Sequence, residues 1–562
     1  MVQARPWNAL LVGVDSPPQN LTFLPSLTKS TLLISDGACS SQSSVCPLPL
    51  PNFWLNSSAH AEFVWIDSPS WDASTWDATV SEPLQLDGQG LLLHETLQLY
   101  NQPKTNINGF VNQAMALTQD MTVNYPDGTN YTMDVGFFSV YGAADNQTWT
   151  STNGSKITLD STLPSVYNGG VIPSTSYSLH MGSASLEVPG SLVLGGYDRS
   201  RCLTTPITSD SSVFQLHGIN IGVRAGASAF IGATRPNISS IQLLSGPELT
   251  VLPNPGVPYM YLPRATCDAI AEYLPVNYNA DKGLYIWNTS NPAYQQIVSS
   301  PHTLSFTFAS STSGSNDTIH IPFALLNLTL DSPIVNPPLQ YFPCSPYSPS
   351  DSTTYHLGRA FLQGAFLAQH WQTNTTWLAQ APGPAKSSEN IINLEPEDTT
   401  LAAMVNGPNW YSTWQDTLKP LANDKPGEIT DSLSGGAIAG IVVGVVVGVL
   451  LVVAAVVFFF IRRRRARSSA GANAPGDGDD TRQELKDYPT EDNDHAAGAS
   501  TPLVTSPSEA HSRHLVEAPY TEIHEIAGSK NRHDDEDPFK DKEMKLAEME
   551  DRRSPVAELP TN

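Results

Sequence analysis

The feature that most constrains this chain is an uncharged run near its C-terminus. Residues 435–461 read GGAIAGIVVGVVVGVLLVVAAVVFFFI, and five arginines follow between positions 462 and 467. About 20 apolar residues suffice to cross a bilayer as a helix, so the run predicts a transmembrane helix rather than a buried core helix. Because flanking arginines stay on the cytosolic side, we expect residues 1–434 outside and residues 462–562 in the cytosol. The location expected is the plasma membrane or another membrane of the secretory pathway.

Two further patterns stop at the same boundary. Asn-x-Ser/Thr glycosylation sequons occur at Asn20, Asn56, Asn130, Asn146, Asn153, Asn237, Asn288, Asn316, Asn327 and Asn374, all before the span. The cysteines also precede it, at Cys39, Cys46, Cys202, Cys267 and Cys344. Glycans and disulfides both form in the secretory compartment, so the patterns predict a glycosylated, disulfide-containing domain outside the cell.

The N-terminus lacks one expected feature. Its apolar run, Ala9 to Val14, is too short for a signal peptide. We therefore expect the native N-terminus to carry a signal sequence that is absent here. The alternative, an inverted orientation, conflicts with the arginines and the sequons.

Charge and motif content exclude several classes of function. The 562-residue chain has a net charge of −25 and only 29 Lys and Arg residues, which argues against a nucleic-acid partner. Zinc-type Cys/His spacing, a phosphate-binding glycine loop and a nucleophilic serine elbow are all missing from the sequence, so no cofactor or metal is predicted. Residues 462–562 are polar, mostly acidic and without hydrophobic periodicity, which predicts a disordered cytosolic tail.

From residue 6 to residue 381 the pattern is that of an all-β protein. Short alternating runs such as FQLHGINIGV and HTLSFTF are separated by turns rich in Pro, Gly, Asn and Ser. Because this length exceeds one β-sandwich, we expect two lobes, residues 1–190 and 191–381. Residues 382–434 are predicted to form an extracellular stalk.

Four segments, in order, resemble the pepsin-like aspartic peptidase family over about two-thirds of the chain. The segment from Ser16 to Cys46, SPPQNLTFLPSLTKSTLLISDGACSSQSSVC, resembles the first active-site region. GSLVLGGYDRSR (190–201) resembles the strand and Gly-Gly turn near the junction of the lobes. NPGVPYMYLP (254–263) resembles the second active-site loop, and YHLGRAFLQGAFLAQHWQTNTTWLAQA (355–381) resembles the C-terminal block.

The resemblance implies a bilobal double β-barrel. It also implies two disulfides, Cys39–Cys46 and Cys267–Cys344, with Cys202 left unpaired.

The sequence departs from the family at the two residues that carry its chemistry. Pepsin-like peptidases use a pair of aspartates, one from each lobe, that share a proton. Aligned on the surrounding motifs, Ser26 stands at the first aspartate position and Asn254 at the second, whereas Gly256 of the second loop is retained. The resemblance therefore implies a domain without a catalytic dyad. Asn254 is interpreted either as a residue that caps its turn or as part of a ligand-contacting pseudo-active site.

Two other aspartates resemble parts of the motif. Asp67 lies in VWIDSPSW and Asp134 in TMDVGFF, and structural roles are expected for both. The flap tyrosine of the family has no clear counterpart in this sequence.

The sequence thus predicts a surface binding or sensing protein, with an extended peptide as one class of ligand and membrane lipid around its span. The alternatives are an active membrane-anchored aspartic endopeptidase with an unrecognised carboxylate pair, and a structural surface glycoprotein. Glycines recur every fourth residue in the span, at Gly436, Gly440, Gly444 and Gly448. This spacing either packs two helices into a homodimer or reflects the general frequency of glycine in membrane helices.

Overall fold

The computed structural model describes residues 2–4, 7–15, 18–35, 38, 53, 66–72, 77–101, 105–107, 112–118, 120–144, 146–150, 156–231, 241–309, 316–351, 353–385 and 388–422. Contacts divide the chain into one unit of residues 1–432 and another of residues 433–562. The second unit, with the predicted span, its glycines and the tail, lies outside the described residues, as do Cys39 and Cys46. Within the described ranges, no helix is long and apolar enough to cross a membrane.

Strands predominate in the first unit, which confirms the β character expected from the alternating pattern. The first sheet runs in the order β1 (Val2–Ala4), β2 (Trp7–Val14), β3 (Gln19–Ser26), β12 (Gly136–Ser139), β4 (Thr31–Ile34), β9 (Asn112–Thr118), β7 (Gln89–Asn101), β5 (Ile66–Asp72), and β8 (Thr105–Ile107) pairs with β7. All residues of β4 and β12 are buried, because these strands lie in the middle of the sheet.

A second sheet is built from later residues. Its order is β25 (Asn316–Pro322), β24 (His302–Ala309), β19 (Phe214–Val223), β20 (Leu249–Pro253), β29 (Thr354–Leu357), β21 (Met260–Leu262), β28 (Cys344–Pro346). A disulfide joins Cys267 of α4 (Arg264–Ala271) to Cys344 of β28, with a Cα–Cα distance of 5.8 Å. This pairing, which the family resemblance implied, is confirmed.

A third sheet brings together segments far apart in the sequence. Its order is β16 (Ser191–Leu194), β15 (Ser176–His180), β30 (Ala365–His370), β31 (Thr375–Gln380), β18 (Ile207–Ser209). Beside it, β17 (Gly196–Asp198) pairs with β32 (Ile391–Asn393). Cys202 is a free, buried cysteine in the hydrophobic cluster packed here, as the family resemblance implied.

Part of the predicted stalk lies against this folded unit. Leu394, Trp414 and Leu418 are buried, and η5 (Trp410–Trp414) begins with an Asn409 side-chain cap. The backbone of Lys419 donates a hydrogen bond to the carbonyl oxygen of Ser299 at the end of α5 (Pro292–Ser299). Residues 388–422 therefore pack onto the β-sheets rather than extending from them.

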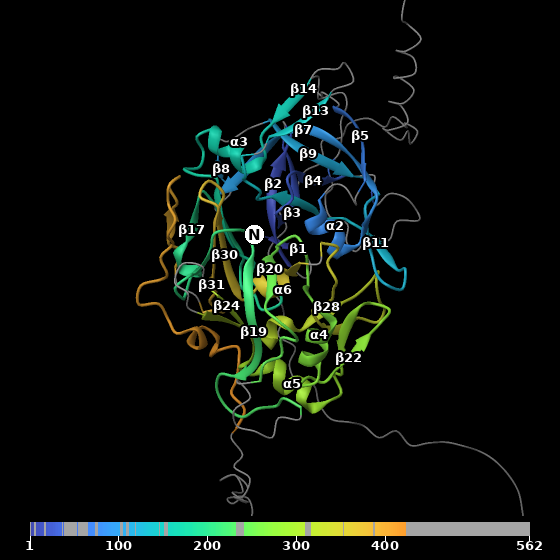
Figure 1. Ribbon diagram of the computed structural model, residues 1–562, viewed down its shortest axis with the longest axis vertical. Coiled ribbons are helices and arrows are strands. Elements are labelled where there is room, and N and C mark those ends of the chain that lie inside the picture. Colours follow the sequence, from blue (N-terminus) through green and yellow to red (C-terminus); the bar gives the residue numbers. More distant parts are fainter. Residues whose placement is uncertain are drawn as a thin grey trace, which may run out of the picture. The chain divides into compact units, whose positions relative to one another are not determined.

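Smaller sheets and short helices complete the described structure. The small sheets are β11 (Asn130–Thr132), β10 (Thr122–Asn124), β6 (Leu86–Asp87); β13 (Gln147–Thr150), β14 (Lys156–Leu159); and β22 (Val276–Asn279), β23 (Leu284–Trp287), β27 (Leu339–Phe342), β26 (Leu328–Leu330). The helices not yet named are α2 (Ala78–Leu84), α3 (Thr162–Asn168), η2 (Arg199–Arg201), η4 (Phe323–Leu326) and α6 (Arg359–Leu362). Figure 1 shows β2, β3, β4, β7 and β9 gathered in its upper part, and α4, α5 and β22 in its lower part.

One strand arrangement occurs twice. In the first sheet, β12 lies between β3, to which it is parallel, and β4, to which it is antiparallel. In the second sheet, β29 lies in the same way between β20 and β21. In both motifs the outer strand continues into a parallel pair, β4 with β9 and β21 with β28. The loops that leave β3 and β20 therefore occupy equivalent places in the two sheets.

The described sequons lie mainly on the surface. Exposed asparagines are Asn20, Asn130, Asn146, Asn288, Asn316 and Asn374, and Asn327 is half-buried. Asn56, Asn153 and Asn237 lie outside the described residues. Glycosylation at the exposed positions needs no rearrangement of the fold.

Candidate functional site

The repeated motif brings Ser26 and Asn254 together. Ser26 ends β3, and Asn254 directly follows β20. Both side chains lie against Gly256: a Cβ added to this glycine would be 2.8 Å from Ser26 Oγ and 3.1 Å from Asn254 Oδ1. The two residues aligned with the catalytic aspartates of the family thus meet at one point of the fold, although 228 positions separate them in the sequence.

The side-chain amide of Asn254 has hydrogen-bonding neighbours at both its nitrogen and its oxygen. Its Nδ2 donates to the carbonyl oxygen of Thr79, 2.7 Å away, and lies 3.3 Å from Nδ1 of His356. Its Oδ1 accepts from the backbone N–H of Gly256 at 2.9 Å. Asn254 is fully buried. Since a buried amide needs such partners, the side chain stabilises its own loop and also joins that loop to α2.

His356 completes this arrangement as a neutral ring. Burial lowers the pKa of His356 to about 4, so the imidazole is uncharged near neutral pH. Its Nδ1 can then accept the second Nδ2 hydrogen of Asn254.

Ser26 is also buried and tied to its own loop. The backbone N–H of Thr28 donates to Ser26 Oγ at 3.3 Å, and the backbone N–H of Val140 donates to the Ser26 carbonyl oxygen. A hydroxyl and a carboxamide do not titrate in the acidic range. The pair therefore cannot share a proton in the way that two carboxylates do.

Helix α2 fills the space beside these two residues. Its buried Val80 has Cγ1 only 2.6 Å from the position of a Cβ on Gly256. Asp77 caps the helix, since its Oδ1 accepts from the backbone N–H of Thr79 at 3.0 Å. At the other end, Glu82 accepts hydrogen bonds from the backbone N–H and hydroxyl of Ser350. The helix is thus anchored to both sequence halves.

A cavity of about 160 Å³ adjoins the segment that follows Asn254, because Pro258 and Tyr259 line it. Its wall combines residues from strands of the first sheet with residues from the second half of the chain. The lining residues include Trp7, Tyr131, Asp134, Tyr259, Tyr341 and Arg359. Arg359 reaches the loop, because its Nη1 donates to the carbonyl oxygen of Pro255 at 2.8 Å.

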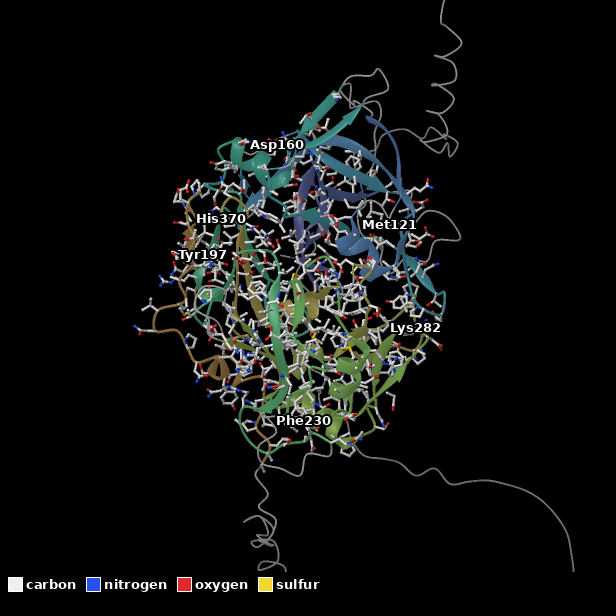
Figure 2. The ribbon with its side chains drawn as sticks, in the orientation of Figure 1. Met121, Asp160, Tyr197, Phe230, Lys282 and His370 are labelled. Carbon is white, nitrogen blue, oxygen red and sulfur yellow. A yellow bond between two sulfur atoms is a disulfide. The ribbon has the colours of Figure 1, made fainter. Side chains whose placement is uncertain are left out.

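Two hairpin turns meet beside this cavity. The turn between β10 and β11 carries Asp127, and the turn between β22 and β23 carries Lys282. Lys282 Nζ lies 2.6 Å from Asp127 Oδ2 and donates to Thr129 Oγ1 at 2.7 Å. Figure 2 shows Lys282 at the right-hand edge of the molecule, below Met121 of the first half. The ion pair therefore links the two halves of the unit.

The other two aspartates considered in the sequence, Asp134 and Asp67, lie in different parts of the fold. Asp134 is buried and lines the cavity, whereas Asp67 lies in β5, whose side chains are not described. Sequence reasoning missed Arg359, which lies in the segment 355–381. A single charge in the otherwise uncharged run LGRAFLQGAFLA was the signal that could have identified it. Among the described residues, no cluster of His, Cys, Asp or Glu is placed to hold a metal ion.

The sequence matches no protein-family model, and no curated protein is significantly similar to it.

Proposed function

We propose that this chain is a single-pass membrane glycoprotein with a pepsin-like, bilobal ectodomain that lacks peptidase activity and binds or senses a ligand at the cell surface. The observation that carries the proposal is the state of Asn254. This residue stands at an aspartate position of the family motif and is fully buried. Its side-chain amide is hydrogen-bonded to the Thr79 carbonyl oxygen and to the Gly256 backbone N–H. A peptidase of this family needs a carboxylate there, open to water and substrate.

The twofold strand motif supports the pepsin-like part of the proposal. Two equivalent loops, one from each sheet, meet at Gly256, which is the arrangement that a dyad shared between lobes requires. The proposed ligand class is an extended peptide, because strand-like backbone hydrogen bonds can hold a peptide without any catalytic group.

The test is a peptidase assay on the purified full chain. We expect no cleavage of denatured protein substrates between about pH 2 and pH 6, the range in which an aspartate pair shares a proton, and no binding of pepstatin-type inhibitors. Ser26→Ala and Asn254→Ala are the matched controls. Cleavage that survives both substitutions and resists pepstatin comes from a contaminant. Pepstatin-sensitive cleavage by the purified wild-type chain would refute catalytic silence, and its persistence in both variants would assign it to a carboxylate pair elsewhere in the chain.

A further inference from the structure

The cavity beside the Asn254 loop contains a buried cation that lacks a carboxylate partner. Arg359 is 5% exposed, and its Nε is buried without a hydrogen-bond partner. Its hydrogen bond to Pro255 uses Nη1. None of the ion pairs among the described residues involves Arg359. A charge buried in this way is costly unless something else compensates it.

Arg359 stays protonated although no anionic group of the described residues is paired with its guanidinium. The guanidinium carbon lies 5.2 Å from the centre of the Trp7 ring, a distance at which the ring face attracts a cation. Burial lowers the pKa of Arg359 to about 10, so the group is still protonated at neutral pH. The ring stabilises the cation but offers no oxygen to its N–H donors.

Tyrosine hydroxyls surround the same space. Tyr125, Tyr131, Tyr259 and Tyr341 line the cavity, and the hydroxyls of Tyr125 and Tyr259 are 3.3 Å apart. Burial raises the pKa of all four lining tyrosines, so each keeps its hydroxyl proton. Neutral hydroxyls and one guanidinium together form a set of donors suited to an anionic oxygen.

We propose that this cavity binds a small monocarboxylate, with the carboxylate on Arg359 and the tyrosine hydroxyls and an apolar tail on the remaining wall. The wall also contains Leu24, Val123, Phe137 and Ile334, which suit such a tail. At about 160 Å³ the cavity is smaller than the roughly 300–1,000 Å³ that holds a drug-sized ligand. The inference goes beyond the proposed function, because an active peptidase or an inert glycoprotein could have the same site.

The charge of the wall selects the class of anion. Asp134 and Asp331 also line the cavity. Carboxylates on the wall repel every anion and a multiply charged one such as phosphate most strongly, so the single guanidinium of Arg359 favours a singly charged ligand. Asp331 and Ser332 are exposed, so the cavity opens to solvent beside them.

The experiment measures binding to the full chain in detergent or nanodiscs by calorimetry and thermal unfolding. The probes are butyrate and benzoate, with butyramide and benzamide as neutral partners of the same shape and inorganic phosphate as a multiply charged anion. We expect the two acids to bind and raise Tm, and the amides and phosphate to have no effect. Equal responses to acid and amide, preferential binding of phosphate, or no response to either acid would overturn the proposal.

Variants locate the site. Arg359→Gln should weaken carboxylate binding at least about tenfold, since a hydrogen-bonded charge contributes about 1.5–3 kcal/mol. Arg224→Gln, at an arginine away from the cavity wall, should leave the affinity unchanged. If Arg359→Gln does not fold, Ile334→Trp provides a second route, because it fills the cavity without altering the guanidinium. Unchanged affinity in Ile334→Trp would place any carboxylate binding elsewhere and refute the assignment.

Short peptides distinguish the source of the carboxylate. A blocked dipeptide with a free C-terminus is compared with its C-terminal amide. Binding of the free form together with the small acids identifies a site that also accepts peptide ends. Binding of the small acids alone assigns the site to free carboxylic acids, and binding of the amidated form would contradict recognition of a carboxylate.

Discussion

At the residue scale, Asn254 is required as an amide rather than an acid. The Thr79 carbonyl oxygen can only accept a hydrogen bond, and Asn254 Nδ2 supplies it at 2.7 Å. An ionised aspartate would instead place two acceptors against each other in a fully buried position. The amide at this position and the position of α2 are therefore linked, because an amide in this loop allows the helix to pack directly onto it.

Asn254→Asp is expected to destabilise the folded unit by about 1–3 kcal/mol at pH 7, the usual cost of an unsatisfied buried polar group. Burial beside a carbonyl oxygen would raise the folded-state pKa of the new acid above its unfolded value. The penalty should be absent below about pH 4, where both states are protonated, and grow as pH rises toward the folded pKa.

Urea unfolding at low and neutral pH measures this effect. The control is Asn277→Asp, at an exposed asparagine of β22 that is not a sequon. A penalty of equal size at both pH values, or none in Asn254→Asp, would show that the amide bond to Thr79 is unimportant.

At the element scale, α2 is a short helix whose stability depends on the residue that caps its N-terminus. It has only seven residues, about two turns, contains Pro83, and lacks acidic residues in its first turn. The carboxylate of Asp77 satisfies the Thr79 backbone N–H and the Thr79 hydroxyl, and its other oxygen lies 3.3 Å from the Lys29 backbone nitrogen. The cap therefore also connects the helix to the loop that follows Ser26.

Asp77→Ala should reduce the free energy of unfolding by about 0.5–2 kcal/mol, because the cap of α2 is lost. Asp77→Ser, which keeps a capping oxygen, should recover most of the loss. Urea midpoints of the two variants provide the measurement. Equal destabilisation by alanine and serine would indicate that the contact with the Lys29 loop, rather than helix capping, explains the effect.

The predicted transmembrane element carries a separate expectation. If the glycine stripe packs two spans together, Gly440→Ile with Gly444→Ile should abolish self-association of residues 430–468, because isoleucine prevents close approach of the backbones. Val442→Ile with Val446→Ile is the matched control and should leave association intact. A membrane two-hybrid assay or crosslinking distinguishes the two pairs. The same behaviour in both pairs, or no association of the wild-type span, would contradict the dimer.

At the scale of the whole folded unit, the two sequence halves are joined by the third sheet, by α2 and by the hairpin ion pair. The third sheet pairs β15 with β30 along a continuous register. The ion pair between Asp127 and Lys282 is partly exposed, so it is a contact between halves that solution conditions can change.

Acid should release this ion pair. The hydrogen bonds from Lys282 and then Thr129 lower the pKa of Asp127 to about 2. A depressed folded-state pKa contributes stability above the ordinary aspartate value of about 4, and this stability is lost as pH falls through about 2. Amide exchange of residues 122–132, corrected for intrinsic rates, should therefore accelerate between about pH 4 and pH 2.

Lys282→Met should produce the faster exchange already at neutral pH. Lys419→Met is the control, because the Lys419 ammonium donates to the carbonyl oxygen of Gln415 and contacts neither hairpin. Exchange of the 122–132 hairpin that is unaffected by Lys282→Met would mean that the hairpins are held by other contacts.

Local patterns in the sequence determined which segments form strands. The alternating segment FQLHGINIGV, for example, forms β19. Successive side chains of a strand point to opposite faces, so a strand can be recognised from the alternation of apolar and polar residues along a short stretch of sequence. Family-like motifs also identified the Cys267–Cys344 bridge and the positions of Ser26 and Asn254. These inferences depend on short stretches of sequence, or on the order of such stretches along the chain.

Only the tertiary structure decided what those residues touch. Thr79 and Asn254 lie 175 positions apart. No local pattern indicates that the carbonyl oxygen of Thr79 will accept a hydrogen bond from the side-chain amide of Asn254. The buried guanidinium of Arg359 and the Trp7 ring beside it are brought together by the pairing of distant strands. Strand pairing joins residues that are far apart in the sequence and depends on the packing of the whole core. The environment of a buried polar group therefore follows from the complete fold and not from its neighbours in the sequence.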